Sequence, residues 1–403
     1  MKLLYFTTAS NEESYEKLQA RSRKKASVAP QVFETALLRA MAQRDDLELT
    51  LRSFPMIAAF PKSPLLLWGA RRESVADKLT TEWLPTVNLY GLKQWSQRLS
   101  SGRAVKRWLR KNKNEPNKAV LLYSVYEPIA ASVQKYCKKY GCKSFVIVPD
   151  LPRDMYKELS PNKAVALFQK RYMRRAVACQ DGFDAYIYLT EAMREVVAPC
   201  APYTVMEGIA DLSAFGNETK KETAKKAIMY AGNLSMQCGV GNLIEAFCML
   251  DRKDTELWLF GEGSGAAQAE AFASENERIR FFGRRSRQEV LAYEQRAELL
   301  INVRDPNDLY TRYSFPSKTI EYMLSGTAVL TTRLSGIPKE YEKHLLMMDD
   351  NAPETIAHAM QAALAMPTDA RHRMGKEAAD FIASQKNGRI QADKIIRFIS
   401  RQL

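Results

Sequence analysis

The sequence lacks several features that would place it in a simple class. No apolar run approaches the ~18 residues that a membrane-spanning helix needs, and there is no low-complexity stretch or internal repeat. The six cysteines are dispersed, without a Cys-x-x-Cys pair or a nearby His at metal-ligand spacing. We therefore expect a globular protein with no metal site and with reduced thiols, as in a cytoplasmic protein.

Histidine is scarce, and its distribution limits the chemistry. The three histidines, His344, His358 and His372, all lie in the second half of the chain. The first half therefore offers no imidazole base, which argues against a displacement reaction that depends on a His from that half.

Positive charge, by contrast, is abundant in the first half. Residues 1–215 carry 34 Lys and Arg against 21 Asp and Glu, whereas residues 216–403 carry 26 against 25. The densest basic clusters lie at 21–25, 103–113, 135–143 and 170–175. Such a one-sided field attracts nucleic acid or an anionic membrane surface. No nucleic-acid-binding motif accompanies the clusters, so we expect a membrane surface and no nucleic acid.

One of these clusters also contains apolar residues. Within 103–113, Val105, Trp108 and Leu109 recur at helical spacing among cations, which favours a helix lying in a lipid interface. A solvated helix face with one buried Trp is the alternative interpretation.

Short apolar runs alternate with helical patterns along the whole chain, which predicts a doubly wound α/β protein. The expected strands lie near 3–7, 47–53, 119–123, 144–149 and 185–190, then near 227–231, 256–260, 278–282, 299–303 and 328–331. The pattern is interrupted at 212–225, so we predict two Rossmann-like domains that divide at 215/216. The last helix, near 389–403, places Ala392, Ile395, Ile396 and Ile399 on one face.

The most informative segment runs from Tyr313 to Thr331. It predicts a short helix that opens between 314 and 317, stops at Gly326 and leads into a strand. The N-terminus of a helix binds anions, so a phosphate is expected near Ser317 and Lys318. Glu321 lies one turn further on and has acceptors for a diol such as a ribose. An amphipathic helix with a solvated Lys–Glu pair is the alternative.

Further candidate residues follow other strands, where open α/β sheets bind their ligands. Gly232 and Asn233 follow one strand and are placed for a diphosphate, and Gly261 and Glu262 close the next one. Arg304 follows a third strand and, with Lys318, offers two positive charges to a leaving diphosphate. Ordinary turn glycines, and a surface salt bridge from Arg304 to Asp305 or Asp308, are the competing interpretations.

Three stretches give the second half a family likeness: Tyr230-Ala-Gly-Asn, Leu257-Trp-Leu-Phe-Gly-Glu-Gly and the Ser-Phe-Pro-Ser-Lys run at 314–318. In order and spacing they resemble the donor-binding domain of GT-B glycosyltransferases, most closely the retaining family 4 and its bacterial capsular and exopolysaccharide enzymes. The resemblance is strongest over 229–341.

The resemblance implies a GT-B fold, with two Rossmann-like domains facing each other across a cleft. The C-terminal helix would cross back, so that the first, acceptor-side domain comprises 1–215 plus 388–403 and the donor-binding domain comprises 216–387. It implies a retaining, metal-independent hexosyltransferase-type enzyme without a cofactor, which uses a UDP- or GDP-linked sugar. The acceptor would be a lipid-linked or polysaccharide intermediate, and the enzyme would be cytoplasmic and peripheral on the inner face of the membrane.

The chain also departs from the family pattern. Asn233 and Cys238 stand where many members carry an Arg and a Lys that grip the diphosphate, and Tyr313 stands where a first carboxylate precedes Glu321. Arg304 and Lys318 would then supply the catalytic charge. In the first half, Asp150 is the candidate for orienting the acceptor, and 207–208 is the candidate for approaching the sugar. A helix cap or a turn is the alternative for each.

These departures keep two other functions open. One is a non-catalytic GT-B subunit that stabilises a partner glycosyltransferase and exposes an apolar patch. The other is a sugar-nucleotide epimerase of the same fold.

Overall fold

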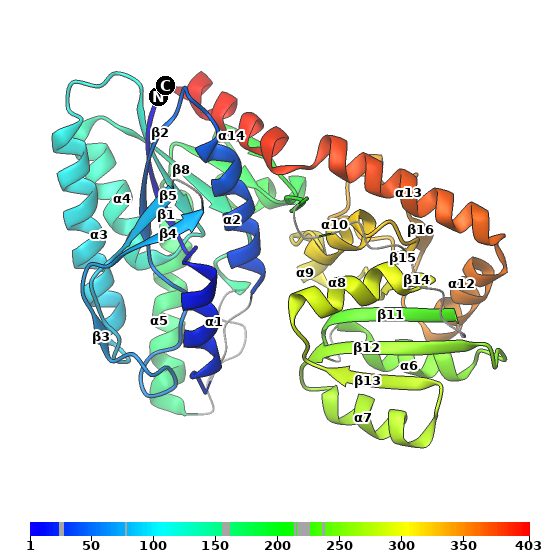
Figure 1. Ribbon diagram of the computed structural model, residues 1–403. Helices are drawn as coiled ribbons and strands as arrows, with labels where there is room; N and C mark the ends of the chain where they lie inside the picture. The colour runs from blue at the N-terminus through cyan, green and yellow to red at the C-terminus, as the bar shows by residue number, and fades with distance from the viewer. Residues whose placement is uncertain (24–27, 77–78, 155–161, 213–214, 216–225, 236–237) are drawn as a thin grey trace. The chain divides into compact units, whose positions relative to one another are not determined.

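The computed structural model describes residues 1–23, 28–76, 79–154, 162–212, 215, 226–235 and 238–403. The chain divides into two compact units (Figure 1). Unit 1 comprises Met1–Ile209 and Gly388–Leu403, and unit 2 comprises Ala210–Asn387. The C-terminal helix α14 (Gly388–Gln402) is thus part of unit 1.

Unit 1 is built on an eight-stranded sheet in the order β10-β9-β8-β7-β1-β2-β5-β4. All neighbouring strands pair in parallel except β4, which is antiparallel to β5. Its strands are β1 (Lys2–Thr7), β2 (Glu48–Ser53), β4 (Arg72–Ala76), β5 (Leu79–Trp83), β7 (Lys118–Tyr123), β8 (Lys143–Val148), β9 (Ala185–Tyr188) and β10 (Tyr203–Val205). A separate antiparallel ribbon joins β3 (Leu67–Trp68) to β6 (Thr86–Val87).

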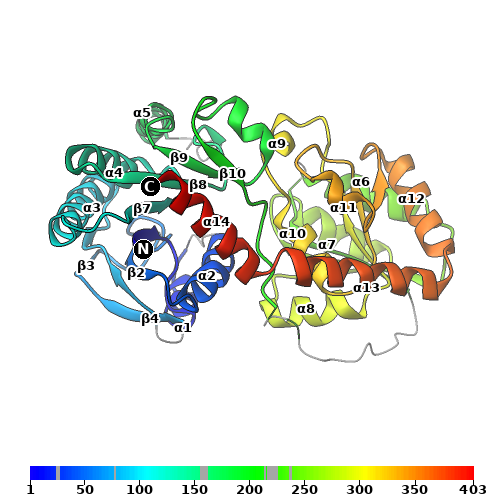
Figure 2. The same cartoon turned by 90° about the horizontal axis from the view of Figure 1, so that it is seen from above.

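Helices cover both faces of this sheet because alternate strand residues bury apolar side chains on each side. The helices are α1 (Glu12–Ala20), α2 (Ala29–Ala42), α3 (Leu92–Lys111), α4 (Glu127–Tyr140), α5 (Lys163–Cys179), the short 3₁₀ helix η2 (Glu191–Glu195) and α14. On one face, α2 and α14 lie side by side (Figure 2) and share a core cluster with β1 and β7. The four predicted apolar positions of α14 are all buried in that cluster.

Unit 2 has a six-stranded, fully parallel sheet in the order β13-β12-β11-β14-β15-β16. Its strands are β11 (Lys226–Asn233), β12 (Thr255–Glu262), β13 (Ile279–Gly283), β14 (Leu299–Asn302), β15 (Val329–Thr332) and β16 (Leu346–Met348). The order steps outward from β11 in both directions, so its carboxyl end is a topological switch point of the kind at which open sheets bind ligands.

The helices of unit 2 also cover both faces of their sheet. They are α6 (Val240–Cys248), α7 (Ala266–Glu275), α8 (Arg287–Arg296), α9 (Leu309–Arg312), α10 (Ser317–Leu324), α11 (Lys339–Glu342), α12 (Pro353–Ala365) and α13 (Thr368–Gln385). One core cluster joins α6, α7 and α12 to the sheet. On the opposite face, Tyr293 of α8 packs against Trp258 and Phe260 of β12, with ring centroids 5.2 and 5.0 Å apart.

The ten predicted strands all form, with ends that shift by at most two residues. The sequence patterns did not reveal the edge strands β4, β10 and β16, the inner strand β5 or the β3–β6 ribbon, which are short or have little apolar alternation. The units meet at Ile209/Ala210 instead of the predicted 215/216. Most of the predicted linker, 213–214 and 216–225, lies outside the described residues, as do positions 24–25 of the first basic cluster.

The prediction that Val105, Trp108 and Leu109 of α3 lie in a lipid interface is wrong. Val105, Trp108 and Leu109 are 0%, 7% and 1% exposed, and the Trp108 indole N–H donates to Oγ1 of Thr50 on β2 at 3.2 Å. These side chains lie against the sheet because the second half of α3 has no other apolar face to bury. In the described part of the chain, no helix is both long and apolar enough to cross a membrane.

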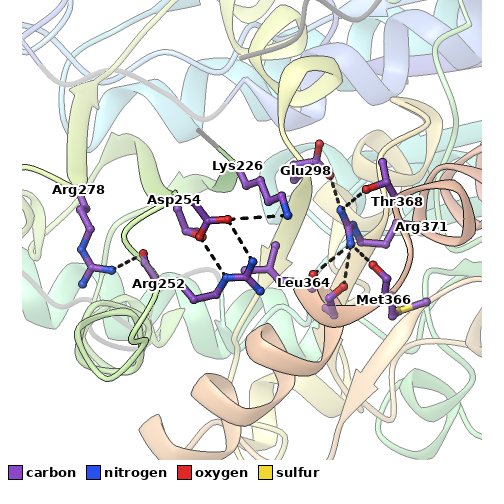
Figure 3. A network of polar contacts seen from close by, with 11 residues as sticks. Lys226, Arg252, Asp254, Arg278, Glu298, Leu364, Met366, Thr368 and Arg371 are labelled. Carbon is purple, nitrogen blue, oxygen red and sulfur yellow. Dashed lines mark hydrogen bonds and ion pairs between the residues drawn. The ribbon is translucent and has the colours of Figure 1, made fainter. Parts of the chain in front are cut away.

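A buried cation ties α12 and α13 together at the end of unit 2. The Arg371 side chain is 1% exposed and its Nη2 lies 2.9 Å from Oε2 of Glu298 (Figure 3). Its Nη1 donates to carbonyls at the end of α12, including that of Leu364 at 3.3 Å, and also to that of Met366. The guanidinium thus satisfies carbonyls that a helix end leaves without partners.

Replacement of this cation should be costly. We expect Arg371→Met to lower the free energy of unfolding of unit 2 by about 3 to 5 kcal/mol, because it leaves Glu298 and several buried carbonyls unpaired. Glu298→Gln, which keeps an acceptor, should cost about 1 kcal/mol. Urea unfolding measures both. Equal, small losses in the two variants would show that Arg371 is held mainly by packing.

Candidate functional site

The predicted anion-binding helix forms as α10. It begins at Ser317, directly after Pro316, and no side chain caps its first turn. Ser317 is exposed, whereas the residues just before it, from Tyr313 to Pro316, are buried. The first backbone N–H groups of α10 are therefore not capped by a side chain, and the segment that leads into the helix is buried. A helix N-terminus of this kind can bind an anion.

A buried tyrosine fixes α10 against the end of β11. The Tyr322 side chain is 1% exposed. Its hydroxyl accepts from the Ala231 amide at 2.7 Å and donates to the Ala231 carbonyl at 3.1 Å. Because Ala231 directly precedes Gly232, this contact sets the position of α10 relative to the glycine turn. Sequence reasoning missed Tyr322, although a Tyr on the buried face of a short amphipathic helix must find a partner for its hydroxyl.

The glycines at the ends of β11 and β12 are required by close backbone approach. Gly232 pairs with Gly261, and Asn233 with Glu262, in the parallel ladder. Gly261 has φ of 135°, and a Cβ there would lie 1.8 Å from the Gly232 carbonyl oxygen. No other residue fits that position. The four predicted residues thus lie together at one edge of the sheet, the edge to which Tyr322 fixes α10.

The side chains of the Asn233–Glu262 pair point in different directions. A Cβ on Gly263 would meet the Asn233 side-chain oxygen at 2.5 Å, so Asn233 lies over the turn after β12. Glu262 is exposed and forms an ion pair with Arg284 at 3.2 Å. The half-buried backbone of Gly232 lies at the same end of the sheet and is a candidate to contact a diphosphate.

Lys318 lies between two carboxyl groups. Its Nζ contacts Oε1 of Glu321 and lies 3.4 Å from Oε1 of Glu294 on α8. The Lys318 side chain remains 36% exposed, whereas that of Glu294 is fully buried. Burial alone would lower the pKa of Lys318, but Glu294 and Glu321 raise it above its ordinary value. Lys318 therefore stays charged and is open to a ligand from the solvent side.

Glu321 is held as an anion by two cations. Its other oxygen, Oε2, lies 3.5 Å from Nε of Arg287, and Nη1 of Arg287 lies 3.3 Å from Oδ2 of Asp211. Burial would raise the pKa of Glu321, but Lys318 first and Arg287 second hold it below its ordinary value. A carboxylate has about four acceptor positions, so Glu321 retains acceptors for a hydroxyl pair.

Glu294 is a carboxyl group that sequence reasoning missed. Burial, with the nearby Glu321 carboxylate, raises its pKa to about 8, although Lys318 opposes the shift. At neutral pH it is therefore mainly protonated. A Glu in the last turn of α8 has the sequence signature of a solvent-facing residue, so only its packing beneath Lys318 could have shown its role.

Arg304 lies two residues after β14, which ends at Asn302. Its carbonyl accepts from Oγ1 of Thr332 at 2.7 Å, whereas its Nη1 is buried and has no hydrogen-bond partner among the described residues. Within the same described part of the chain it forms no ion pair with Asp305 or Asp308, whose carboxylates accept from the nearby amides of Asn307 and Tyr310. The surface salt bridge is therefore wrong, and Arg304 retains donor capacity.

Asp150 lies in unit 1, after β8, half-buried at the carboxyl edge of that sheet. It helps to raise the pKa of Tyr123 at the end of β7, after the larger effects of burial and Glu34. The Gly208 carbonyl accepts from Nε2 of Gln391 on α14 at 2.9 Å, so this turn is anchored within unit 1. The acceptor-side candidates and the donor-side candidates thus belong to different units.

A second missed carboxyl group lies beneath that edge of unit 1. Glu34 of α2 is 0% exposed and accepts from the Tyr5 hydroxyl at 2.8 Å and the Thr8 amide at 2.7 Å. Burial raises its pKa to about 7, although its hydrogen bonds with Thr8 oppose the shift. All of these contacts are internal, so we assign Glu34 to the structure of the β1 end.

The carboxyl end of the sheet in unit 2 therefore has groups that are chemically suited to an anion. An uncapped helix N-terminus, an accessible Lys, an Arg whose Nη1 has no partner among the described residues, and half-buried glycine backbone lie at this end of the sheet, with an ionised Glu beside them. Among the described residues, no three His, Cys, Asp or Glu side chains gather as potential metal ligands.

Comparisons with known proteins agree with this geometry. Residues 225–366, which include the whole anion site except Asp211, match the family model described as glycosyl transferases group 1. A search of curated protein sequences finds no match to this chain.

Solved structures resemble the whole chain. Sucrose-phosphate synthase from Thermosynechococcus elongatus has a TM-score of 0.67 at 14% identity and covers 100% of this chain and 99% of its own. HepE from Anabaena in complex with UDP has a TM-score of 0.62 at 14% identity and covers 100% of both chains. A trehalose-6-phosphate structure from E. coli with bound UDP-2-fluoro glucose has a TM-score of 0.66 at 10% identity, and covers 100% of this chain and 99% of its own.

These likenesses confirm the predicted fold class. The chain has the GT-B fold, built from two Rossmann-like units with parallel strands. The family match over 225–366 and the fold together support a glycosyltransferase.

Proposed function

We propose that this protein is a glycosyltransferase that takes a sugar from a nucleoside diphosphate, UDP or GDP, and transfers it to a lipid-linked or polysaccharide acceptor in bacterial surface-polysaccharide synthesis. The observation that carries the donor half of the proposal is the anion site at the start of α10, with Lys318 and Arg304 beside it. The structures with bound UDP and UDP-2-fluoro glucose, which share the fold, are consistent with it.

The site residues divide into three roles in this proposal. The Gly232 backbone and the α10 N-terminus, with Ser317, hold the diphosphate. Lys318 and Arg304 stabilise the charge that develops on the leaving phosphate, which needs no metal ion for that purpose. Glu321 accepts from hydroxyls of the nucleotide sugar. Gly261, Glu262 and Asn233 shape the turns around it.

The acceptor half of the proposal rests on less. Asp150 would orient the acceptor hydroxyl, and the leaving phosphate would take its proton in a reaction that retains the anomeric configuration. The narrower likeness to family 4 capsular enzymes, seen in the run at 314–318, supports the surface-polysaccharide acceptor. In this proposal the enzyme works at the cytoplasmic face of the membrane.

A second candidate is a non-catalytic GT-B subunit that pairs with another glycosyltransferase. Two observations favour it: Asn233 and Cys238 replace the usual cations, and unit 1 exposes several large apolar side chains. Such a subunit would bind no nucleotide sugar, so donor binding separates the two functions.

Donor binding tests the proposal directly. We expect one member of a panel of UDP-, GDP-, dTDP- and CDP-sugars to bind in titration calorimetry. Lys318→Ala should weaken that binding by roughly tenfold or more, since a hydrogen bond to a charged group contributes about 1.5 to 3 kcal/mol. Glu321→Ala should weaken it to a smaller extent and raise the KM for slow donor hydrolysis.

The matched control is Lys253→Ala, an exposed lysine that precedes β12 at the opposite edge of the same sheet. It should bind like the unmodified protein. Failure of every donor to bind would overturn the enzyme function and leave the partner subunit.

Donor affinity should also fall as the pH rises. Glu294 has a pKa of about 8, so above that pH it becomes a second anion beneath Lys318 and opposes the diphosphate. We expect weaker binding at pH 9 than at pH 7, and a flatter profile for Glu294→Gln. Glu289→Gln on the same helix is the control, because the pKa of Glu289 is already lowered by Ser286 and its charge is constant over this range.

The same shift predicts a stability effect of defined sign. The folded-state pKa of Glu294 lies above its unfolded value. The stability that the protonated carboxyl group contributes is therefore fully present below the unfolded pKa and is lost as the pH rises through the folded pKa of about 8. Glu294→Gln should therefore be more stable, relative to the unmodified protein, at pH 9 than at pH 6. An unchanged difference between the two pH values would contradict the burial of an acidic proton at this position.

A further inference from the structure

The β3–β6 ribbon of unit 1 turns an apolar face outward. Leu67 pairs with Val87 in the ribbon, and their side chains are 65% and 38% exposed. The opposite face holds the polar and aromatic anchors: Trp68 donates to the Leu84 carbonyl at 2.8 Å and packs edge-on against Trp83. Period-two alternation thus places the leucine and valine in solvent.

The first half of α3, which lies beside the ribbon, likewise exposes apolar side chains and buries polar ones. Leu92, Trp95 and Leu99 are 49%, 61% and 39% exposed and, at i, i+3 and i+7, share one helical face. The buried residues of the same half are polar, Gln97, Ser100 and Ser101. The Val87 amide of β6 donates to the Ser96 hydroxyl at 3.0 Å, so helix and ribbon are neighbours. Figure 1 shows α3 beside β3.

An aromatic contact joins this surface to α5. The Tyr90 ring, 47% exposed, lies 5.2 Å from that of Phe168, and its hydroxyl donates to the Val165 carbonyl at 3.3 Å. Leu167, next to Phe168, is 71% exposed and is the most exposed of the large apolar residues in the described chain. An exposed apolar surface of this extent, spread over three elements, marks an interaction site.

Cations continue the apolar stripe on both helices. On α3 the stripe of Leu92, Trp95 and Leu99 is followed on the same side by Arg103, Lys106 and Arg110. On α5, Leu167 is followed at i+3, i+4 and i+7 by Lys170, Arg171 and Arg174, all exposed. Neither helix contains an Asp or a Glu. The surface is therefore apolar at one end and purely basic beyond it.

We propose that this surface, formed by Leu67 and Val87 of the ribbon, Tyr90, the exposed stripe of α3 and the Leu167 side of α5, binds an anionic lipid bilayer. Aromatic and leucine side chains enter the region between headgroups and acyl chains, and the flanking cations meet lipid phosphates. The inference rests on the proposed function for its setting, a lipid-linked acceptor, but its residues all lie outside the donor site.

Charge complementarity selects this occupant over others. A second copy of the chain would bring two basic surfaces together, which costs energy. A nucleic acid would satisfy the cations but would leave the leucine side chains in water. An anionic bilayer satisfies both, since its phosphates are at the surface and its apolar region lies just beneath.

Cosedimentation with large vesicles tests the inference on the full chain. We expect binding to an equal mixture of phosphatidylcholine and phosphatidylglycerol, and much weaker binding to phosphatidylcholine alone. The double variant Leu67→Ser/Trp95→Ser should bind the mixed vesicles roughly tenfold less tightly or worse. Arg103→Glu/Arg174→Glu should do the same and should lose the difference between the two kinds of vesicle.

Two controls make the outcome decisive. Met249→Ser removes an apolar side chain of unit 2 that is 52% exposed and should leave vesicle binding unchanged. Both double variants should bind the donor as the unmodified protein does, which also shows that they are folded. If the unmodified protein binds no donor, that result counts against the proposed function and not against the lipid-binding surface.

Failure of the unmodified protein to bind mixed vesicles would overturn the inference, as would equal binding by the double variants. If the unmodified protein bound single-stranded RNA and the Arg103→Glu/Arg174→Glu variant did not, the surface would be assigned to nucleic acid. Stable capture of a partner glycosyltransferase that the Leu67→Ser/Trp95→Ser variant loses would assign it to a protein.

Discussion

The candidate donor site depends on the two hydrogen bonds between the Tyr322 hydroxyl and the backbone of Ala231. They join the buried face of α10 to the carboxyl end of β11. The position of the helix N-terminus is therefore fixed relative to Gly232. The neighbouring ladder adds a second constraint, because the Gly232 carbonyl occupies the space that any side chain at Gly261 would need. The anion site is therefore rigid before a ligand arrives, and less binding energy is lost in ordering it.

The electrostatics of the site follow from what is packed beneath it. Lys318 contacts two carboxyl groups, and if both were ionised they would neutralise its charge and oppose a diphosphate. Burial of Glu294 keeps that group protonated, so the net charge around Lys318 stays near zero and Arg304 adds a further positive charge. The positive charge thus comes from α10 and from the end of β14, whereas the family pattern places it after β11, where this chain has Asn233 and Cys238.

The two units divide the chemistry in the same way that the sequence divides the charge. Unit 2 has 22 Lys and Arg against 25 Asp and Glu, and the candidate anion site lies among paired charges. Unit 1 contains most of the excess cations, and two of its helices carry them without any acidic residue. A glycosyltransferase that draws a soluble donor to one unit and works on an acceptor at a charged surface would need such a division.

Much of the fold could be predicted from the sequence, and so could most of the anion site. Most of the ten predicted strands are short apolar runs, which a local pattern reveals, and the start of α10 follows from Pro316 and the polar residues after it. The short strands β3 and β6 could not be predicted, because two residues have no periodicity. Glu294 and Tyr322 could not be assigned roles, since a Glu and a Tyr on a helix have many surroundings. Trp108 was assigned to a lipid interface, whereas Trp95, on the same helix, is the exposed one.

The sequence by itself determined the alternation of strands and helices, the glycine turns and the separation of charge, because each depends on residues close together in the chain. Only the tertiary structure decided which side of α3 faces the sheet and which faces solvent, that Glu294 lies beneath Lys318, and that Nη1 of Arg304 finds no partner among the residues the structure describes. Burial and charge pairing depend on groups that come from distant parts of the chain, and their energies are set by the local dielectric that packing creates.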